Sequence, residues 1–352
     1  MLSEGRADHI EPDLVSVIIP TYNRAVLLLQ AISSVHQQTW PHIQIIVADD
    51  GSTDNTEELV SEMRDVVYVK QDHRGQGSAR NLGLRHAKGE FIATLDSDDL
   101  WKPDFVENSV NALRTLNADF VFSNWTDETP DGRCHVSHFE QVYGWAGYAE
   151  TELSGWRVIE PEQSRAIYME SCISPSSALL FPRELIADGW SENLKIGDDR
   201  CLLLSWVLSR PCRVAVATQP RWIKRVCGDN ISYVRGDMDS KRYASIYDFR
   251  VLLDRYSGVM TNKECAWFHA KIAFNQLVLS RFELRERRPA KVLPLLLQSI
   301  GSMLHAVALS PDIIAKCTRE LVNRKRKLAS TVNRPRKSKA LSGETAESGQ
   351  VS

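Results

Sequence analysis

The sequence has no excess of charge of one sign and none of the cysteine pairs that hold zinc or a redox disulfide. Forty-three basic and 45 acidic residues among 352 give a formal net charge of −2, so we expect no nucleic acid partner. The seven cysteines are scattered, without a C-x-x-C pair, and we expect reduced thiols. A hydrophobic fraction of 43% excludes a wholly disordered chain and supplies enough apolar side chains for a sizeable core.

We also expect neither a secretory leader nor a membrane span. The opening residues, MLSEGRADHIEPD, are polar and acidic, whereas a secretory signal has a basic start and an apolar middle. The longest nearly uncharged stretch, Val292 to Leu309, contains Pro294, Gln298 and His305. We expect it to be too polar and too short to cross a bilayer. A cytoplasmic location is therefore expected.

What the sequence does contain is a regular alternation of short apolar runs with amphipathic segments. Continuous β-branched runs are typical of strands in a parallel sheet buried on both faces, and the segments between them have helical spacing. The pattern predicts an α/β protein with a doubly wound, mostly parallel sheet flanked by helices. Predicted strands are 15–19, 43–48, 66–69, 91–95 and 213–217, and predicted helices are 24–38, 53–63, 103–116, 198–209 and, in part, 240–327.

Three carboxylates lie within four residues in Asp96-Ser97-Asp98-Asp99, directly after a predicted strand. Ligands of doubly wound sheets bind beyond the carboxyl ends of the strands, and carboxylate oxygens suit a divalent cation such as Mg²⁺. The alternative is a solvated loop in which Asp99 caps the next helix. Taken alone, the segment fits both interpretations.

Three other polar segments follow strands or open helices. Asp50 stands where a carboxylate can accept a hydrogen bond from a base or a ribose, or complete a turn. The segment from Gly75 to Gly83 has Arg80 where a G-x-G-x-x-G fingerprint needs glycine, and it fits either a cationic lip over phosphates or a polar loop. Asp198 and Asp199 open a predicted helix, which by itself favours a helix cap over a general base.

Taken together, these segments closely resemble family 2 glycosyltransferases in their order and spacing. The resemblance is dense from Val15 to Leu116 and sparser to Ser232. It implies a GT-A fold and transfer of a sugar, with inversion, from a nucleoside diphosphate sugar, a UDP-sugar being favoured. It also implies Mn²⁺ or Mg²⁺, a hydroxyl of a glycan or lipid-linked molecule as acceptor, and a setting in the synthesis of cell-surface polysaccharide or glycoconjugate. The segments that carry it are 15–24, 38–39, 47–54, 79–83, 87–90, 95–99, 102–104, 197–199 and 225–232.

The resemblance also implies roles for single residues. Asp199 would be the catalytic base, and Asp98 would bind the metal together with Asp96, which would also lie near the ribose. Tyr22 would lie against the base of the nucleotide, and Asp50 would hydrogen-bond it. The remaining implied donor-binding residues are Pro20, Thr21, Arg24, Gly77, Arg80, Asn81 and Ser97.

On this basis the chain divides into four parts. We expect an N-terminal arm at 1–12, a GT-A domain at 13–238, a helical C-terminal region at 239–330 and a disordered basic tail at 331–352. The GT-A domain would consist of a nucleotide-sugar half, 13–125, and an acceptor half, 126–238. Eight Lys or Arg and no acid lie between Leu321 and Lys339, which suits either an anionic membrane surface, such as the inner face of the plasma membrane, or a solvated tail.

One position departs from the family pattern, because Cys227 stands where many members have a histidine. A neutral thiol is a poor ligand for a hard Mg²⁺ ion, so binding of the metal or the diphosphate would need a substitute, for which His73, Lys224 and Arg225 are candidates. Two alternatives stay open: a nucleotidyltransferase on a similar fold, and a non-catalytic sugar-binding protein. A nucleotidyltransferase usually has a triphosphate-binding loop after its first strand, and this sequence has none there. The presence of Asp98 and Asp199 argues against a non-catalytic protein.

Overall fold

The computed structural model describes residues 10–129, 132, 134–136, 139, 148–226 and 238–319. Cys227, most of the predicted N-terminal arm and the whole predicted tail lie outside these ranges. The proposed division of the chain into four parts therefore stays a prediction at both ends.

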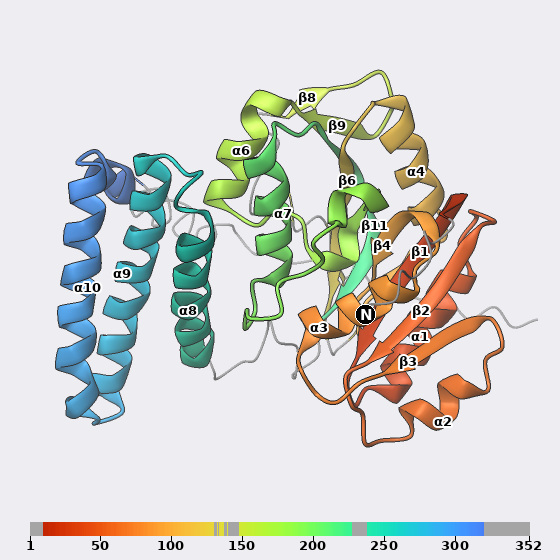
Figure 1. The fold of residues 1–352 in the computed structure, drawn as a ribbon, viewed down its shortest axis with the longest axis horizontal. Helices are drawn as coiled ribbons and strands as arrows, with labels where there is room; N and C mark the ends of the chain where they lie inside the picture. Colours follow the sequence, from red (N-terminus) through yellow and green to blue (C-terminus); the bar gives the residue numbers. More distant parts are fainter. Residues whose placement is uncertain are drawn as a thin grey trace, which may run out of the picture.

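Within the described residues, eleven strands form one sheet in the order β3-β2-β1-β4-β10-β6-β11-β9-β8, with β5 beside β11 and β7 beside β6 (Figure 1). The longer pairings, β1 with β2 and β4, β2 with β3, and β6 with β11, are parallel. The strands are β1 (Glu11–Thr21), β2 (Ile43–Asp49), β3 (Val66–Lys70), β4 (Gly89–Thr94), β5 (Leu100–Trp101), β6 (Phe120–Glu128), β7 (Cys134–Val136), β8 (Ala149–Glu150), β9 (Trp156–Ile159), β10 (Leu179–Pro182) and β11 (Val214–Arg225).

The four predicted N-terminal strands are confirmed, and burial explains why they could be predicted. Val17, Ile18 and Ile19 of β1 are completely buried, since helices cover both faces of the sheet and neither face needs polar side chains. The short strand β10 was not predicted. It runs antiparallel between β4 and β6, so the predicted mostly parallel sheet is mixed at its centre.

Nine helices flank this sheet or extend beyond it in the described part of the chain. They are α1 (Ala25–His36), α2 (Thr56–Ser61), α3 (Gln76–His86), α4 (Phe105–Thr115), α6 (Pro161–Glu170), α7 (Asp198–Ser209), α8 (Met238–Tyr256), α9 (Asn262–Arg285) and α10 (Pro289–Leu309). The helices predicted within 24–38, 53–63, 103–116, 198–209 and 240–327 are thus present.

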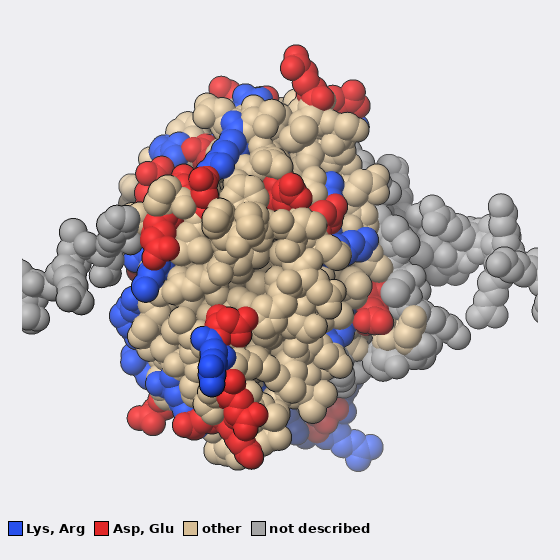
Figure 2. Space-filling view, turned by 90° about the vertical axis from the view of Figure 1, so that its right-hand side faces the viewer, with Lys and Arg blue, Asp and Glu red and all other residues tan. Residues whose placement is uncertain are grey.

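Figure 2 shows the side of the molecule that carries β1 to β3, where acidic and basic side chains are interspersed around an uncharged middle.

The C-terminal helices α8, α9 and α10 lie side by side, with α10 outermost (Figure 1). Helix α9 begins with a capping box in which the Thr261 side chain accepts from the Glu264 backbone N–H, while the Glu264 side chain accepts from the Thr261 backbone. Glu264 also pairs with Arg165 of α6 at 2.8 Å, which ties the helical extension to the sheet domain. Helix α10 has 21 residues and contains an 18-residue stretch with a mean hydropathy of 1.7, so the expectation that this stretch is too short and too polar to span a membrane is wrong by length and composition.

Candidate active site

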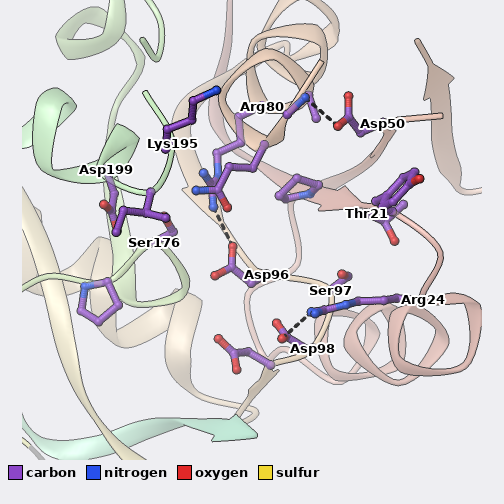
Figure 3. Close-up of a pocket in the computed structure, with 18 of the residues that line it drawn as sticks. Thr21, Arg24, Asp50, Arg80, Asp96, Ser97, Asp98, Ser176, Lys195 and Asp199 are labelled. Atoms are coloured by element: carbon purple, nitrogen blue, oxygen red, sulfur yellow. Dashed lines mark hydrogen bonds and ion pairs between the residues drawn. The ribbon is translucent and has the colours of Figure 1, made fainter. Parts of the chain in front are cut away.

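The site is a cavity of about 950 Å³ beyond the carboxyl ends of β1, β2 and β4, where loops from parallel strands converge. Its wall is completed by α3, by the start of α7 and by two C-terminal helices. Figure 3 shows three groups of side chains along it. Thr21 and Asp50 lie at one end, Arg80, Asp96 and Asp98 in the middle, and Ser176, Lys195 and Asp199 at the other end.

The end of the cavity at Thr21 and Asp50 contains a buried hydroxyl group, that of Thr21. The Thr21 hydroxyl is buried and has no hydrogen-bond partner among the described residues, although it lines the cavity. Tyr22, 42% exposed, has its ring centroid 4.2 Å from that of His73. An orphaned buried hydroxyl beside an exposed aromatic face is suited to hold a flat, polar ring such as a nucleotide base.

Asp50 holds together the loop that surrounds this pocket. Its carboxylate accepts hydrogen bonds from the backbone N–H groups of Arg74, at 2.8 Å, and Gly75, at 2.7 Å. His73 lies 2.9 Å from the same carboxylate. Gly51 adopts φ of +86°, and a Cβ there would lie 2.9 Å from the His73 backbone nitrogen, so only glycine allows this loop to approach so closely.

Three carboxylates lie together in the middle of the cavity. Asp96, Asp98 and Asp99 each offer an oxygen within 4.8 Å of the others. Burial, followed by the charge of Asp96, raises the pKa of Asp98 against the opposing effect of its ion pair with Arg24. Burial, followed by the charges of Asp98 and Asp96, raises the pKa of Asp99 well above its ordinary value. Such a cluster of hard oxygen donors fits a divalent cation, which would relieve the repulsion.

The structure decides between the two interpretations that the sequence left open for Asp99. It does not cap α4, whose N-cap is Asp104. Instead Asp99 is buried, accepts a hydrogen bond from the Ser177 hydroxyl at 2.6 Å and accepts another from the Arg225 backbone at 3.2 Å. The interpretation of Asp99 as a helix cap is therefore wrong, and this carboxylate belongs to the acidic cluster.

Arg80 connects the acidic cluster to the start of α7. Its completely buried guanidinium pairs with Asp96 at 2.7 Å and also with Asp198. Because the Asp198 carboxylate is buried and paired with Arg80, its charge is compensated inside the protein. This pairing separates the roles of the two adjacent aspartates at the helix start.

Asp199 is the partly exposed member of that pair and lines the cavity. One carboxylate oxygen accepts a hydrogen bond from the Arg200 backbone at 2.7 Å. Loss of hydration, followed by the charge of Asp198, raises the pKa of Asp199 to about 7, although Arg80 opposes the shift. A carboxylate of this kind on a rigid helix end can accept a proton near neutral pH.

Most residues that the sequence predicted for the site do line the cavity, and two do not. Pro20, Thr21, Tyr22, Arg24, Asp50, Arg80, Asp96, Ser97, Asp98 and Asp199 are all in its wall. Gly77 instead packs against the segment before α7, where a Cβ would lie 2.7 Å from the Ser191 carbonyl oxygen. The Asn81 amide donates to the Trp190 carbonyl at 2.8 Å and its oxygen accepts from the Trp190 backbone at 2.7 Å. Both residues thus support the segment that leads to Asp199.

Several wall residues were missed because no motif marks them. Pro175, Ser176, Lys195, Ile196, Arg242, Ser245 and Asn275 line the cavity and come from loops and helices far apart in the sequence. Of the proposed substitutes for the family histidine, His73 and Lys224 also line it, whereas the Arg225 side chain is buried and donates to the Asp98 carbonyl at 2.6 Å. Tyr148 and Trp156, two aromatic residues of the predicted acceptor half, are buried core residues.

The comparison with protein families agrees with the residues in the cavity. Residues 16–186 match the model of glycosyl transferase family 2. One relative is the UDP-Glc:alpha-D-GlcNAc-diphosphoundecaprenol beta-1,3-glucosyltransferase WfaP of Escherichia coli. The two sequences are 36% identical over 116 residues, and the matched segment covers 32% of this chain and 46% of that protein. The chain is 39% identical over 127 residues to an uncharacterized glycosyltransferase of Rickettsia typhi, covering 36% of this chain and 40% of that one. The chain thus spans less than half the length of these curated relatives.

Solved structures show the same fold. The structure of Staphylococcus aureus TarS 1-349 superposes with a TM-score of 0.56 and 19% identity, covering 84% of this chain and 81% of that one. The mannosyltransferase PcManGT from Pyrobaculum calidifontis, in complex with GDP-Man and Mn²⁺, gives a TM-score of 0.52 and 18% identity and covers 94% of this chain and 87% of that one. The predicted GT-A type of fold, with its C-terminal helices, is confirmed.

Proposed function

We propose that this protein transfers a sugar from a nucleoside diphosphate sugar to an acceptor hydroxyl, with inversion, because residues 16–186 match the model of glycosyl transferase family 2. The observation that carries the proposal is the order of groups along one cavity. A pocket with an unpartnered hydroxyl, an acidic cluster and a half-buried carboxylate with a pKa of about 7 follow one another. These are the groups needed to hold a base, a diphosphate and an acceptor in line.

The donor would lie with its base between Thr21 and Tyr22 and its ribose near Asp96. Thr21 would donate or accept a hydrogen bond with the base, which would satisfy its buried hydroxyl. Asp50 would act on the base mainly through the loop that it holds, since loop donors already surround its carboxylate. The name of the Escherichia coli relative supports a UDP-sugar as donor.

A divalent cation, Mn²⁺ or Mg²⁺, would be held by Asp98 and Asp96 and would neutralise the charge that develops on the departing diphosphate. The Mn²⁺ in the structure of the archaeal mannosyltransferase supports this assignment. Arg24 pairs with Asp98 from the side of the nucleotide pocket (Figure 3). It would therefore keep this carboxylate ionised and oriented before a ligand enters.

Asp199 would act as the general base. As the acceptor oxygen forms its bond to the anomeric carbon, the hydroxyl proton would pass to the Asp199 carboxylate, and the bond from the anomeric carbon to the diphosphate oxygen would break. Attack from the end of the cavity opposite the diphosphate gives inversion of configuration. General base catalysis of this kind contributes typically about 10²–10⁴-fold to the rate.

The acceptor would be a glycan or a lipid-linked saccharide, and the setting the synthesis of a cell-surface polysaccharide or glycoconjugate. Lys195, Lys224 and Arg242 add positive charge to the cavity wall, which suits an acceptor that carries a phosphate or another acidic group. The name of the Escherichia coli relative, whose acceptor is a diphosphate-linked lipid, supports the same class. Such an acceptor would place the protein in the cytoplasm, at the inner face of the plasma membrane.

The test is a panel of UDP-, GDP- and dTDP-sugars, assayed for binding and hydrolysis with Mn²⁺ or Mg²⁺. We expect Asp98→Ala to lose metal-dependent donor binding. Asp199→Asn should keep donor binding and lose about 10²-fold or more in turnover. Asp188→Asn, which changes an exposed aspartate outside the cavity, is the matched control and should behave as wild type. Absence of binding to every nucleotide sugar by the folded protein would refute the proposal and favour the non-catalytic alternative.

A further inference from the structure

Helix α10 presents a continuous apolar face that no described part of the protein covers. Leu293, Leu297, Ile300 and Leu304 are 63%, 60%, 57% and 65% exposed. Their spacing of four, three and four residues places them on one side of the helix. Because α10 is the outermost helix (Figure 1), this face, called here the α10 leucine face, points away from the sheet domain.

The opposite side of α10 is attached to the folded protein. The Ser299 hydroxyl donates to the Ala273 carbonyl of α9 at 2.8 Å, and the Ser302 hydroxyl donates to the Gln276 side chain at 3.0 Å. Leu295 and Ala306 are buried. Only 17% of the 18-residue apolar stretch of this helix is buried inside the protein, yet these contacts hold α10 along α9. A helix so attached lies flat against an apolar phase and does not cross it.

The charges around the α10 leucine face indicate what covers it. No Lys, Arg, Asp or Glu occurs between Lys291 and Asp312, so the face itself is free of charge. At the turn between α9 and α10, Arg285, Arg287, Arg288 and Lys291 are exposed and outnumber the two nearby glutamates.

A leucine stripe flanked by basic residues matches the interface of a bilayer that contains anionic lipids. The leucines would enter the region between headgroups and acyl chains, while the arginines would meet lipid phosphates. A second copy of this chain would bring the same basic residues to the contact, without the opposite charge that anionic lipid supplies. The charge pattern therefore favours a membrane over self-association.

We propose that the α10 leucine face docks in the plane of an anionic membrane. The docking anchors the protein with its helical extension on the lipid and its sheet domain in the aqueous phase. The inference rests on the exposed face of α10 and on the basic residues beside it, and it does not depend on the proposed transferase activity.

The experiment is flotation of the full-length protein with vesicles of phosphatidylcholine alone or mixed with phosphatidylglycerol. We expect the wild type to float with the anionic vesicles. The variant L297Q/L304Q should lower the vesicle-bound to free ratio at least tenfold, because two exposed leucines lose their apolar contact with lipid. The matched control V26Q/V259Q changes two residues that are 70% and 57% exposed on other surfaces and should bind as wild type.

A second variant, R287E/R288E, tests the charge and changes no residue of the leucine face. It should lower binding to anionic vesicles several-fold and make the remaining binding less sensitive to salt. Equal flotation of wild type and L297Q/L304Q, or no flotation of the wild type, would overturn the proposal. So would light scattering that shows a wild-type dimer converted to a monomer by L297Q/L304Q, since the leucine face would then be a protein interface. Donor binding, measured separately, is expected to be the same in all four proteins.

Discussion

Two adjacent aspartates at the start of α7, Asp198 and Asp199, have different environments. This difference is the basis of the different roles proposed for them. Asp198 is buried and paired with the buried Arg80, so its charge is compensated inside the protein. Asp199 forms no such ion pair within the part of the chain that the structure describes, faces the cavity and has its pKa raised by lost hydration. Neighbouring residues of one type can thus serve as a structural ion and as a base.

The raised pKa of Asp199 predicts how activity depends on pH. A carboxyl group with a pKa of about 7 is largely protonated below pH 7 and cannot accept the acceptor's proton. We expect kcat to fall about tenfold per pH unit on the acid side and to level off above pH 7.5. The residual activity of Asp199→Asn should lack this limb. A wild-type profile that stays flat down to pH 5 would contradict the assignment.

The acidic cluster predicts a stabilising effect of metal. Because the pKa values of Asp98 and Asp99 are raised, their ionised forms cost folding free energy above pH 4, and a bound cation offsets this cost. With Mn²⁺ at 100 times its Kd, unfolding should cost about 2.7 kcal/mol more, which raises Tm by several degrees. Asp98→Ala should reduce this shift. Equal shifts in wild type, Asp98→Ala and the control Asp188→Asn would mean that the ion binds elsewhere.

At the scale of elements, helix ends show both successes and failures of local patterns. Asp54 and Glu57 have the spacing of a capping box, yet the N-cap of α2 is Asn55 without a side-chain bond, and Glu57 pairs with Lys70 at 2.6 Å. The capping box that does form, at Thr261 and Glu264, opens α9. Glu264 keeps this role although it also pairs with Arg165 of α6, so the spacing of a capping box does not by itself identify a helix start.

The close approach of α3 to the segment before α7 predicts the effect of Gly77→Ala. Its Cβ would lie 2.7 Å from the Ser191 carbonyl oxygen, so the segment that leads to Asp199 must move. We expect a loss of about 1–3 kcal/mol of stability and a lower kcat, measured by urea unfolding and by single-turnover rates. Gly258→Ala is the matched control because a Cβ there meets no atom within 4 Å. An unchanged Gly77→Ala protein would show that this contact relaxes at no cost.

At the scale of the whole molecule, the cavity is completed by the C-terminal helices. Arg242 and Ser245 of α8 and Asn275 of α9 line its wall, and Arg242 donates to the Asn275 side chain at 3.1 Å. The helical extension therefore does more than pack beside the sheet domain. It contributes polar side chains to the same cavity as Asp199.

This arrangement predicts that Arg242→Ala affects the acceptor more than the donor. Removing one cation from the wall should raise KM for an acidic acceptor about tenfold, as expected for loss of a charge-assisted hydrogen bond of about 1.5 kcal/mol. KM for the donor should stay unchanged. Arg250→Ala, on the exposed side of the same helix, is the control. A rise in the donor KM alone would place Arg242 at the diphosphate instead.

Local patterns in the sequence were sufficient for the first half of the fold and for most of the cavity. The strands β1 to β4 could be predicted because each contains a short apolar run, which is almost completely buried in β1, β2 and β4 and partly buried in the edge strand β3. The acidic residues at the ends of these strands could be brought together in advance, since the carboxyl ends of parallel strands meet at one edge of a sheet. Asp50, Asp96, Asp98 and Asp199 were identified in this way or through the family resemblance.

Tertiary structure alone decided which groups are paired, which are buried and which are left uncovered. It placed Arg80 between Asp96 and Asp198, decided that Asp99 belongs to the acidic cluster and does not cap α4, and brought Arg242 to the cavity from α8. It also left one face of α10 exposed, where the sequence showed only an apolar helix. These outcomes depend on contacts between residues far apart in the chain, and both pKa values and surface exposure are set by such contacts. The sequence by itself determined the elements and the chemical groups; the packing of those elements determined what each group can do.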